Sequence, residues 1–277
     1  MTLEAHLPND IAADALAHLG LAAGPPTVER LTALVAAYPR RVPWETASRI
    51  VYGPVDGRTP FRSPTRFWRD AIDLGTGGTC FESNRAVAAL LATLGYDVTL
   101  TINDMDEHAA CHTAMIARID GERWLADLGL PVHAVLRLDP DAETTAESPF
   151  HDYAARPAGP RRFDIMRTHH PRPRCFTLHD DPVALPDYDE ATRADYGPGG
   201  LFLDQLIITK VIDGRSWRYR GDEQPQTLEW FARENSGVRC VPADPVPTLG
   251  RHFAMDGDLL ERAWRHLDPS TPDSDGF

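Results

Sequence analysis

The dipeptide Asp120-Gly121 constrains the fold of this chain more than any other feature of its sequence. The largely apolar segments 113–119 and 122–128 flank it, and Asp-Gly between two such segments is typical of a two-residue β-hairpin turn. A turn of this kind pairs Ile119 with Glu122 and thereby fixes every other cross-strand neighbour. The sequence therefore predicts an antiparallel hairpin with a single register.

The register of this hairpin brings two polar residues together. His112 lies opposite Gly129, so Asp127, two residues before Gly129, lies on the same face as His112 and diagonal to it. Diagonal neighbours are roughly 7–8 Å apart at the backbone, within reach of an imidazole–carboxylate hydrogen bond. A slip of one residue would place the two side chains on opposite faces. The hairpin thus predicts a His112–Asp127 pair.

A helix is expected just before the hairpin. Residues 81–94 are rich in helix formers, contain neither proline nor glycine, and place apolar side chains at near-helical spacing. Thr79 is a good N-cap residue, Glu82 three residues later completes a capping box, and Gly95 provides a stop. Cys80 is therefore predicted to be the first residue of a helix.

A cysteine at that position has a functional and a structural interpretation. Free N–H groups and the positive end of the helix dipole favour a thiolate, and Gly75, Gly77 and Gly78 leave room beside the sulfur. A lone cysteine on a helix is more often simply buried, and a lone histidine is more often structural. The predicted meeting of His112 and Asp127 favours the functional interpretation: a thiol nucleophile, its base and the carboxylate that orients the base.

Around these residues the chain resembles the arylamine N-acetyltransferases. The resemblance extends over residues 10 to about 235, is specific around 42–129, weakens after 140, and includes a similarity of segment 200–221 to the family's C-terminal strands. The cysteine motif of the family, Arg-Gly-Gly-Phe-Cys-Phe-Glu-x-Asn, corresponds to Thr76-Gly-Gly-Thr-Cys80-Phe-Glu-Ser-Asn84. The family's histidine corresponds to His112, and its later Asp-Val-Gly corresponds to Asp127-Leu-Gly129. Its early Ile-Pro-Phe-Glu-Asn resembles Val42-Pro-Trp-Glu45-Thr46.

The resemblance implies a role for each matched residue. Cys80 would be the nucleophile that accepts an acyl group, His112 its base and Asp127 the orienting carboxylate. Support for the oxyanion and for the loop that carries the cysteine would come from four further residues, namely Thr79, Glu82, Glu45 and Gly78.

The chain also departs from the family pattern. In the family an arginine and a glutamate brace the loop before the cysteine; the glutamate matches Glu45, but Thr76 stands where the arginine is expected. That brace is therefore expected to be altered or to be supplied by another residue. Thr79 replaces the family's aromatic residue before the cysteine, and Thr46 replaces its asparagine after the glutamate. Gly129-Leu-Pro131 stands where the family has Gly-Phe-Gly after the triad, which leaves the identity of the acyl donor and acceptor open.

The order of elements along the chain fits the α+β fold that the resemblance implies. We expect a helical bundle in residues 1–95 with a helix from Thr27 to Tyr38, a β-barrel-like antiparallel domain in 96–199 that begins with a strand at 97–102, and an α/β lid in 200–277. The triad would lie where the three meet. Within the lid we expect a hairpin about Asp213-Gly214, helices near 227–235 and 258–267, and a disordered tail from Asp268.

The chemistry that this site favours is a two-step acyl transfer. Cys80 would attack a thioester, and the acyl group would then pass to an external amine, which makes the protein an N-acyltransferase or amide synthase. If the second nucleophile were a carbanion within the acyl chain, the protein would be a Dieckmann-type cyclase that releases a ring in natural-product biosynthesis. A cysteine amidase or transglutaminase-like enzyme would use the same residues on amides, and a non-catalytic binding protein would tolerate Cys80→Ser.

No permanently bound cofactor is expected. The cosubstrate would be an acyl-CoA or a phosphopantetheine thioester, which brings in an acyl or peptidyl carrier protein as a partner besides the small-molecule acceptor. Six arginines and a single acid, Asp164, lie within residues 156–174. Arg161, Arg162, Arg167 and Arg172 would then dock the phosphates of coenzyme A or an acidic carrier. The alternative is a solvated loop whose arginines pair with scattered acids.

Composition excludes several other classes of function. The formal net charge of −13 disfavours nonspecific binding of nucleic acid. The four cysteines, Cys80, Cys111, Cys175 and Cys240, form no Cys-x-x-Cys pair, which argues against a zinc site and a disulfide framework. No apolar run approaches the length of a membrane span and no signal region is evident at the N-terminus, so we expect a cytoplasmic protein without a membrane partner.

Overall fold

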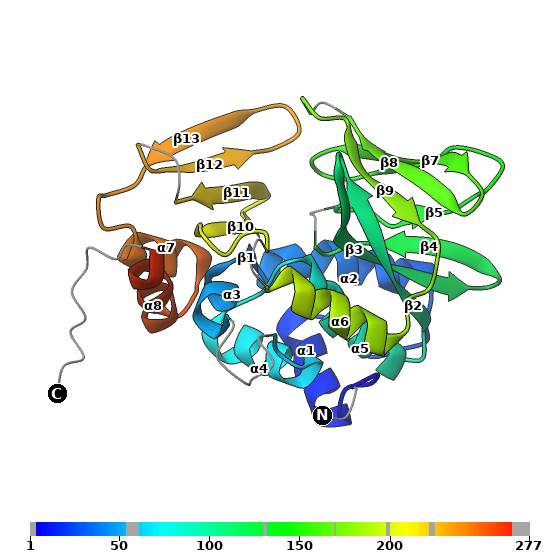
Figure 1. Ribbon diagram of the computed structural model, residues 1–277, viewed down its shortest axis with the longest axis horizontal. Helices are drawn as coiled ribbons and strands as arrows, with labels where there is room; N and C mark the ends of the chain where they lie inside the picture. Colours follow the sequence, from blue (N-terminus) through cyan, green and yellow to red (C-terminus); the bar gives the residue numbers. More distant parts are fainter. Residues whose placement is uncertain are drawn as a thin grey trace.

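The computed structural model describes residues 4–53, 61–129, 132–168, 170–197, 200–221 and 225–267. Figure 1 shows helices packed together on one side of the molecule, with two separate sheets beside them. Pro131 and the tail predicted to be disordered from residue 268 lie outside the described residues.

The first part of the chain is mainly helical. Thr27 caps α2 as predicted, since its side chain accepts a hydrogen bond from the backbone N–H of Arg30, but the helix continues beyond Tyr38 to Arg41. The elements of this part are α1 (Asn9–Leu19), α2 (Val28–Arg41), the short strand β1 (Trp44–Glu45), α3 (Ala47–Tyr52), α4 (Pro64–Leu74) and α5 (Cys80–Thr93).

Helix α5 runs through the centre of the molecule. Every residue from Cys80 to Leu91 is buried, so this helix is surrounded by protein on all sides. It begins at Cys80, and Gly95 follows its end with φ of 86°, both as predicted. The predicted capping box is wrong: Thr79 occupies the N-cap but its side chain bonds no backbone N–H, and the Glu82 carboxylate turns instead to Arg62.

An eight-stranded antiparallel sheet forms the barrel-like part (Figure 1). The edges approach each other where the Thr144 hydroxyl donates a hydrogen bond to the carbonyl of Arg137, so the sheet is nearly closed. Its strand order is β5-β4-β3-β2-β9-β8-β7-β6, formed by β2 (Asp97–Met105), β3 (His108–Ile119), β4 (Glu122–Ala126), β5 (Leu136–Arg137), β6 (Thr144–Glu147), β7 (Asp152–Gly159), β8 (Arg162–Arg167) and β9 (Arg174–His179).

The hairpin register predicted from Asp120-Gly121 is confirmed. Ile119 pairs with Glu122, and the ladder runs back to Met115 opposite Ala126. Asp120 and Gly121 both have positive φ, 51° and 80°, as a type I′ turn requires. The tight turn thus fixes the position of the residues at the far end of the hairpin.

A second antiparallel sheet has the order β1-β10-β11-β12-β13. The hairpin about Asp213-Gly214 is confirmed, but the helix predicted near 227–235 is wrong. Leu228 is fully buried opposite Tyr219, and this pairing with the neighbouring strand outweighs the local helix preference. The sheet and its helices comprise β10 (Ile207–Ile212), β11 (Arg215–Arg220), β12 (Thr227–Phe231), β13 (Ser236–Cys240), α7 (Val246–Phe253) and α8 (Gly257–Leu267).

The predicted α+β fold class is confirmed, and contacts tie its parts together. β1 pairs antiparallel with β10, so the segment just before α3 joins the second sheet. α6 (Leu185–Asp195) lies across α5 (Figure 1), and the Tyr188 hydroxyl donates a 2.9 Å hydrogen bond to the carbonyl of Phe81. The β1–β10 pairing crosses both boundaries predicted near residues 95 and 199, and the contact of Tyr188 with Phe81 crosses the one near 95. No helix of the described residues has the length and apolar character needed to span a membrane.

The tight turn before α5 makes a testable prediction. A Cβ added at Gly77 would lie 1.7 Å from the carbonyl oxygen of Pro43, so Gly77→Ala forces backbone to move. We expect Gly77→Ala to lower the free energy of unfolding by about 1–3 kcal/mol, measured by urea denaturation. Gly257→Ala is the control, because a Cβ there meets nothing within 4 Å at the start of α8. Equal stability of the two variants would contradict the close approach of these backbones.

Candidate active site

Cys80 begins α5 at the edge of the hairpin β3–β4. Its side chain is 9% exposed, and its Sγ lies 3.8 Å from the carbonyl oxygen of Cys111. Its own carbonyl accepts a 2.9 Å hydrogen bond from the Thr113 hydroxyl. Gly129 packs against it so closely that a Cβ on Gly129 would lie 2.2 Å from the Cβ of Cys80. The cysteine is therefore fixed by backbone contacts on both sides.

The structure brings His112 and Asp127 together at the open end of the hairpin. The His112 Nε2 lies 2.9 Å from Oδ2 of Asp127, and both side chains are buried. Burial disfavours the charged imidazole, but the Asp127 carboxylate and a contact with Cys80 outweigh it and raise the pKa of His112 to about 10. The three residues predicted as a triad thus lie within one interacting group.

Asn84 holds this group in place. Its amide Nδ2 donates to the carbonyl of Thr113 at 2.7 Å and to Oδ1 of Asp127 at 3.2 Å, and its Oδ1 accepts from the backbone N–H of Leu128 at 3.0 Å. The Thr113 hydroxyl oxygen in turn lies 3.0 Å from the hydroxyl oxygen of Tyr188. Sequence reasoning quoted Asn84 as part of the motif but assigned it no role, and it passed over Thr113 and Tyr188.

The four predicted supporting residues lie around the turn that precedes Cys80. The Glu45 carboxylate accepts hydrogen bonds from the backbone N–H groups of Ser48, at 2.9 Å, and Gly77, at 3.1 Å. The Gly78 carbonyl accepts from the Ser83 hydroxyl at 3.1 Å. Thr79 and Glu82 complete the set at the start of α5, in contact with the guanidinium groups of Arg49 and Arg62 respectively.

Glu82 forms a buried ion pair with Arg62 that the sequence did not reveal. The carboxylate accepts from the Arg62 backbone N–H at 2.8 Å and from Nη2 at 2.9 Å. Burial opposes ionisation of Glu82, but the neighbouring guanidinium lowers the pKa of the carboxyl. Arg62 lies 20 residues away in sequence and in no recognised motif, so only the folded structure shows the partner.

The four arginines proposed to dock a cosubstrate do not form one patch. The Arg161 guanidinium bonds the carbonyl of Asp180 and pairs with the Asp181 carboxylate at 3.0 Å. Arg167 and Arg172 lie at the opposite end of β8, where Nε of Arg167 donates to the carbonyl of Arg172 at 3.2 Å. Arg162 opens β8 opposite His179, at the end nearer Arg161. The arginine-rich segment is thus divided between two ends of the sheet.

Charge gathers at one of these ends. Burial lowers the pKa of His170, and the positive charges of Arg167, Arg172 and Arg218 lower it further. Arg167 also acts on the buried Cys175, as does Asp127. The charges of Arg167 and Asp127 thus act in opposite directions on the pKa of the Cys175 thiol.

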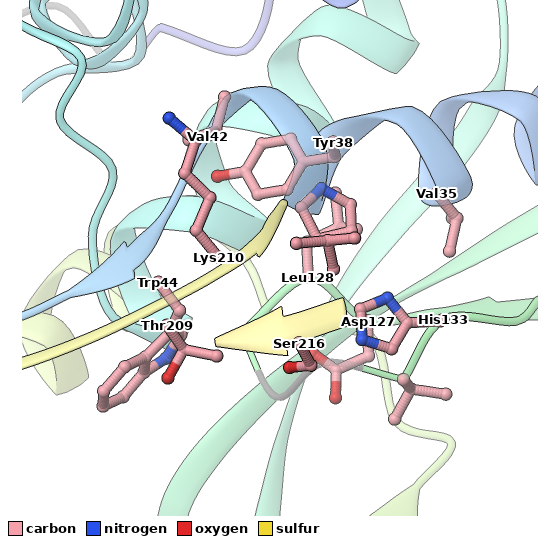
Figure 2. Close-up of a pocket in the computed structure, with 13 residues that line it drawn as sticks. Val35, Tyr38, Val42, Trp44, Asp127, Leu128, His133, Thr209, Lys210 and Ser216 are labelled. Atoms are coloured by element: carbon pink, nitrogen blue, oxygen red, sulfur yellow. The ribbon is translucent and has the colours of Figure 1, made fainter. Parts of the chain in front are cut away.

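Asp127 also lines a small cavity (Figure 2). Residues from α2, from the segment after β4, and from β10 and β11 line it, including Tyr38, His133 and Lys210. Its volume of about 20 Å³ suits roughly one water molecule, and Cys80 does not line it. Burial and Arg41 lower the pKa of Lys210 to about 8, while its Nζ donates to the carbonyl of Phe253. The cavity is too small to hold a substrate.

The described residues hold no group of three or more histidine, cysteine or acidic side chains arranged for a metal ion. All four cysteines are free: Cys80 and Cys175 are buried, Cys111 is half-buried and Cys240 is exposed. What the arrangement supplies is a thiol at a helix N-terminus, an imidazole held by a carboxylate, and buried surroundings. These are the components of nucleophilic catalysis at a carbonyl group.

Comparison with known proteins agrees with this chemistry. The profile of the N-acetyltransferase family matches residues 27–226. A proansamycin X synthase of Amycolatopsis mediterranei is 29% identical over 174 residues, which span 52% of this chain and 66% of that protein. An arylamine N-acetyltransferase of Mycolicibacterium smegmatis is 24% identical over 229 residues, which span 74% of this chain and 78% of the relative.

Solved structures share the fold at low sequence identity. The arylamine N-acetyltransferase of Mycobacterium marinum in complex with CoA has a TM-score of 0.79 and 20% identity, over 93% of this chain and 98% of its own. An arylamine N-acetyltransferase from Bacillus cereus, described as having a unique Cys-His-Glu catalytic triad, has a TM-score of 0.74 and 16% identity, over 90% of this chain and 100% of its own.

The raised pKa of His112 predicts how stability changes with pH. A group whose pKa is higher in the folded than in the unfolded protein stabilises fully below its unfolded value, 6.5, and loses this contribution as pH rises toward about 10. In Asp127→Asn the imidazole loses the partner that raises its pKa. We therefore expect wild type to exceed Asp127→Asn in unfolding free energy by a few kcal/mol near pH 6 and by much less near pH 10.

Urea denaturation at several pH values between 6 and 10 measures this difference. A difference that stays constant over the whole range would show that the Asp127 carboxylate does not hold a proton on His112. Asp104→Asn is a suitable control, because Asp104 bonds His179 at partly exposed positions of the neighbouring strands β2 and β9, where solvent screens the pair.

Proposed function

Because this chain belongs to the arylamine N-acetyltransferase family, we propose that it transfers an acyl group from a thioester to an amine through an acyl-Cys80 intermediate. The observation that carries the proposal is the His112 imidazole, held by Asp127 and in contact with Cys80 at the start of α5. The members of the family are acyltransferases that use acetyl-CoA as a cosubstrate without a permanent cofactor. The roles assigned to the three residues are our proposal.

In the first step Cys80 gives its proton to His112 and attacks the carbonyl carbon of the thioester. The negative oxygen that forms lies near the N-terminus of α5, where backbone N–H groups, including that of Cys80, have no intrahelical acceptor. The carbon–sulfur bond of the donor then breaks, and its sulfur leaves with the proton from His112. The acyl group is now bound to Cys80 as a thioester.

In the second step an amine attacks this acyl-cysteine. His112 takes a proton from the nitrogen, the bond to Sγ breaks, and Cys80 returns as a thiolate beside the imidazolium. Asp127 keeps the imidazole oriented through both steps, and Asn84 keeps Asp127 in place. The raised pKa of His112 favours the imidazolium and so stabilises the thiolate form of the pair.

We propose as a second candidate a reaction in which a carrier protein supplies the acyl chain. The proansamycin X synthase is named for a product that it makes rather than for an arylamine acceptor. In this chain the acyl group would come from a phosphopantetheine arm, and release would form an amide or, by attack of an internal carbanion, a ring. The Dieckmann-type cyclase predicted from sequence differs from acyl transfer to an amine in the second nucleophile. The amidase differs in the substrate consumed, which is an amide instead of a thioester.

The first test is the intact mass of the protein after incubation with acetyl-CoA or with longer acyl-pantetheine thioesters. We expect an acyl adduct that Cys80→Ser abolishes, that Cys240→Ser leaves unchanged and that an arylamine removes. Adducts from the pantetheine thioesters alone support the carrier-fed reaction. No adduct from either donor, in a protein whose Cys80 still reacts with iodoacetamide, contradicts acyl transfer and favours the amidase.

A second test concerns the docking of the donor. We propose that Arg167 and Arg172 attract the phosphates of CoA or of the carrier arm, since Arg218 adds to their charge around His170. We expect Arg167→Gln/Arg172→Gln to raise KM for acetyl-CoA about 3- to 10-fold while leaving KM for an acyl-N-acetylcysteamine, which has no phosphate, unchanged.

Arg161→Gln is the matched control, because its guanidinium is already paired with Asp180 and Asp181. An equal rise in KM for both donors would contradict a phosphate contact and would indicate a change of the site itself. A rise caused by Arg161→Gln alone would move the docking site to the other end of β8.

A further inference from the structure

An arginine from outside the cysteine motif contacts the motif position at which the family has an arginine. Thr76 stands at that motif position, and the Nη1 of Arg62 lies 3.3 Å from its hydroxyl oxygen. Arg62 precedes Thr76 by 14 residues and lies just before α4. The Arg62 guanidinium therefore lies beside the position where the motif arginine is expected.

The guanidinium of Arg62 is fully engaged by its surroundings. Its Nε and Nη2 donate to the two carboxylate oxygens of Glu82 at 3.2 and 2.9 Å, and Nη2 also donates to the carbonyl of Gly77. Nη1 approaches Asp70 at 3.6 Å. The side chains of Arg62 and Glu82 are 4% and 2% exposed, so the pair is shielded from solvent and its geometry is fixed.

These contacts converge on the turn that leads into α5. Arg62 bonds the carbonyl of Gly77, and the Glu45 carboxylate bonds the N–H of the same residue. Glu82 belongs to the first turn of α5, so Arg62 connects that turn to the loop immediately before Cys80. The charge of Glu45 acts on Arg62 as well. One guanidinium therefore links the two backbone segments on either side of the cysteine.

We propose that Arg62 is a positioning residue that replaces the missing motif arginine from another place in the chain and sets the position of Cys80 at the start of α5. Folding alone gives a weak reason for this arrangement, because a buried ion pair is often no more stabilising than an apolar pair of similar volume. A shift of about 1 Å in a reacting atom, by contrast, can change a rate about 100-fold.

The test relocates the arginine. The variants are Arg62→Met, Arg62→Met/Thr76→Arg and the control Arg66→Met, whose side chain is 57% exposed and contacts the same Asp70. Each is treated with iodoacetamide over a range of pH, and alkylation of Cys80 is measured by peptide mass. The exposed Cys240 in the same molecule serves as the internal reference for the reagent.

We expect Arg62→Met to slow Cys80 alkylation about 10-fold or more relative to Cys240 at pH 7 and to shift its pH profile. Arg66→Met should stay within about twofold of wild type, and Thr76→Arg added to Arg62→Met should restore most of the rate. Cys240 should react alike in all variants. If an arginine at a different position restores the alkylation rate, the slow alkylation of Arg62→Met is not the result of a general loss of fold.

A folded Arg62→Met protein with the wild-type alkylation rate and pH profile would overturn the proposal, as would a folded double variant without recovery. If Arg62→Met does not fold, the double variant Arg62→Met/Glu82→Gln is used in its place. It removes both charges of the pair and so leaves no buried charge without a partner. Wild-type alkylation in that variant would likewise overturn the proposal. This proposal rests on the proposed function. Alkylation needs no thioester, however, so a failure of acyl transfer and a failure of this proposal give different results.

Discussion

The contact between the Asn84 side chain and the two strands of the β3–β4 hairpin is the interaction on which the site depends. α5 carries the cysteine, and the hairpin carries the histidine and the aspartate, so the proposed catalysis requires the two elements to keep a fixed relation. Asn84 bonds the carbonyl of Thr113 on one strand and the N–H of Leu128 beyond the other. Because all these groups are buried, an unpaired one would carry the full cost of desolvation, which keeps the helix from sliding along the hairpin.

Buried charges surround this contact in pairs. His112 pairs with Asp127, Arg62 with Glu82, and Arg49 with Asp195, and every one of these side chains is at most 15% exposed. Arg49 also lies over the ring of Tyr196, 4.1 Å from its centroid. Each pair joins segments that are distant in sequence, and each would leave a charge without a partner if the segments separated. The charge pairs therefore make the position of Cys80 dependent on three parts of the chain at once.

The parts of this arrangement that could be predicted from sequence are those fixed by local chemistry. Asp120-Gly121 set the register of the hairpin through the geometry of one turn, and the absence of proline and glycine after Cys80 defined α5. The errors arose where a distant partner overrode a local preference. Glu82 suits a capping box, yet it turns to Arg62; the segment after Thr227 suits a helix, yet it pairs with β11. Nothing near Arg62 in the sequence indicates its partner, because that contact exists only after α4 and α5 have packed.

Close backbone contacts hold Cys80 and the turn before it in place. Gly129 packs against Cys80 and Gly77 against Pro43, and neither position has room for a Cβ. These contacts hold the thiol and the turn before it, whatever the acyl group is. Two residues that depart from the family motifs, Thr46 and Thr79, lie beside this fixed core. The Thr46 hydroxyl donates to the carbonyl of Gln205, and the Thr79 hydroxyl accepts from the Arg49 guanidinium. Neither threonine takes part in the close contacts of Gly77 and Gly129, so these two departures from the motifs leave the thiol and the turn before it held by the same backbone contacts.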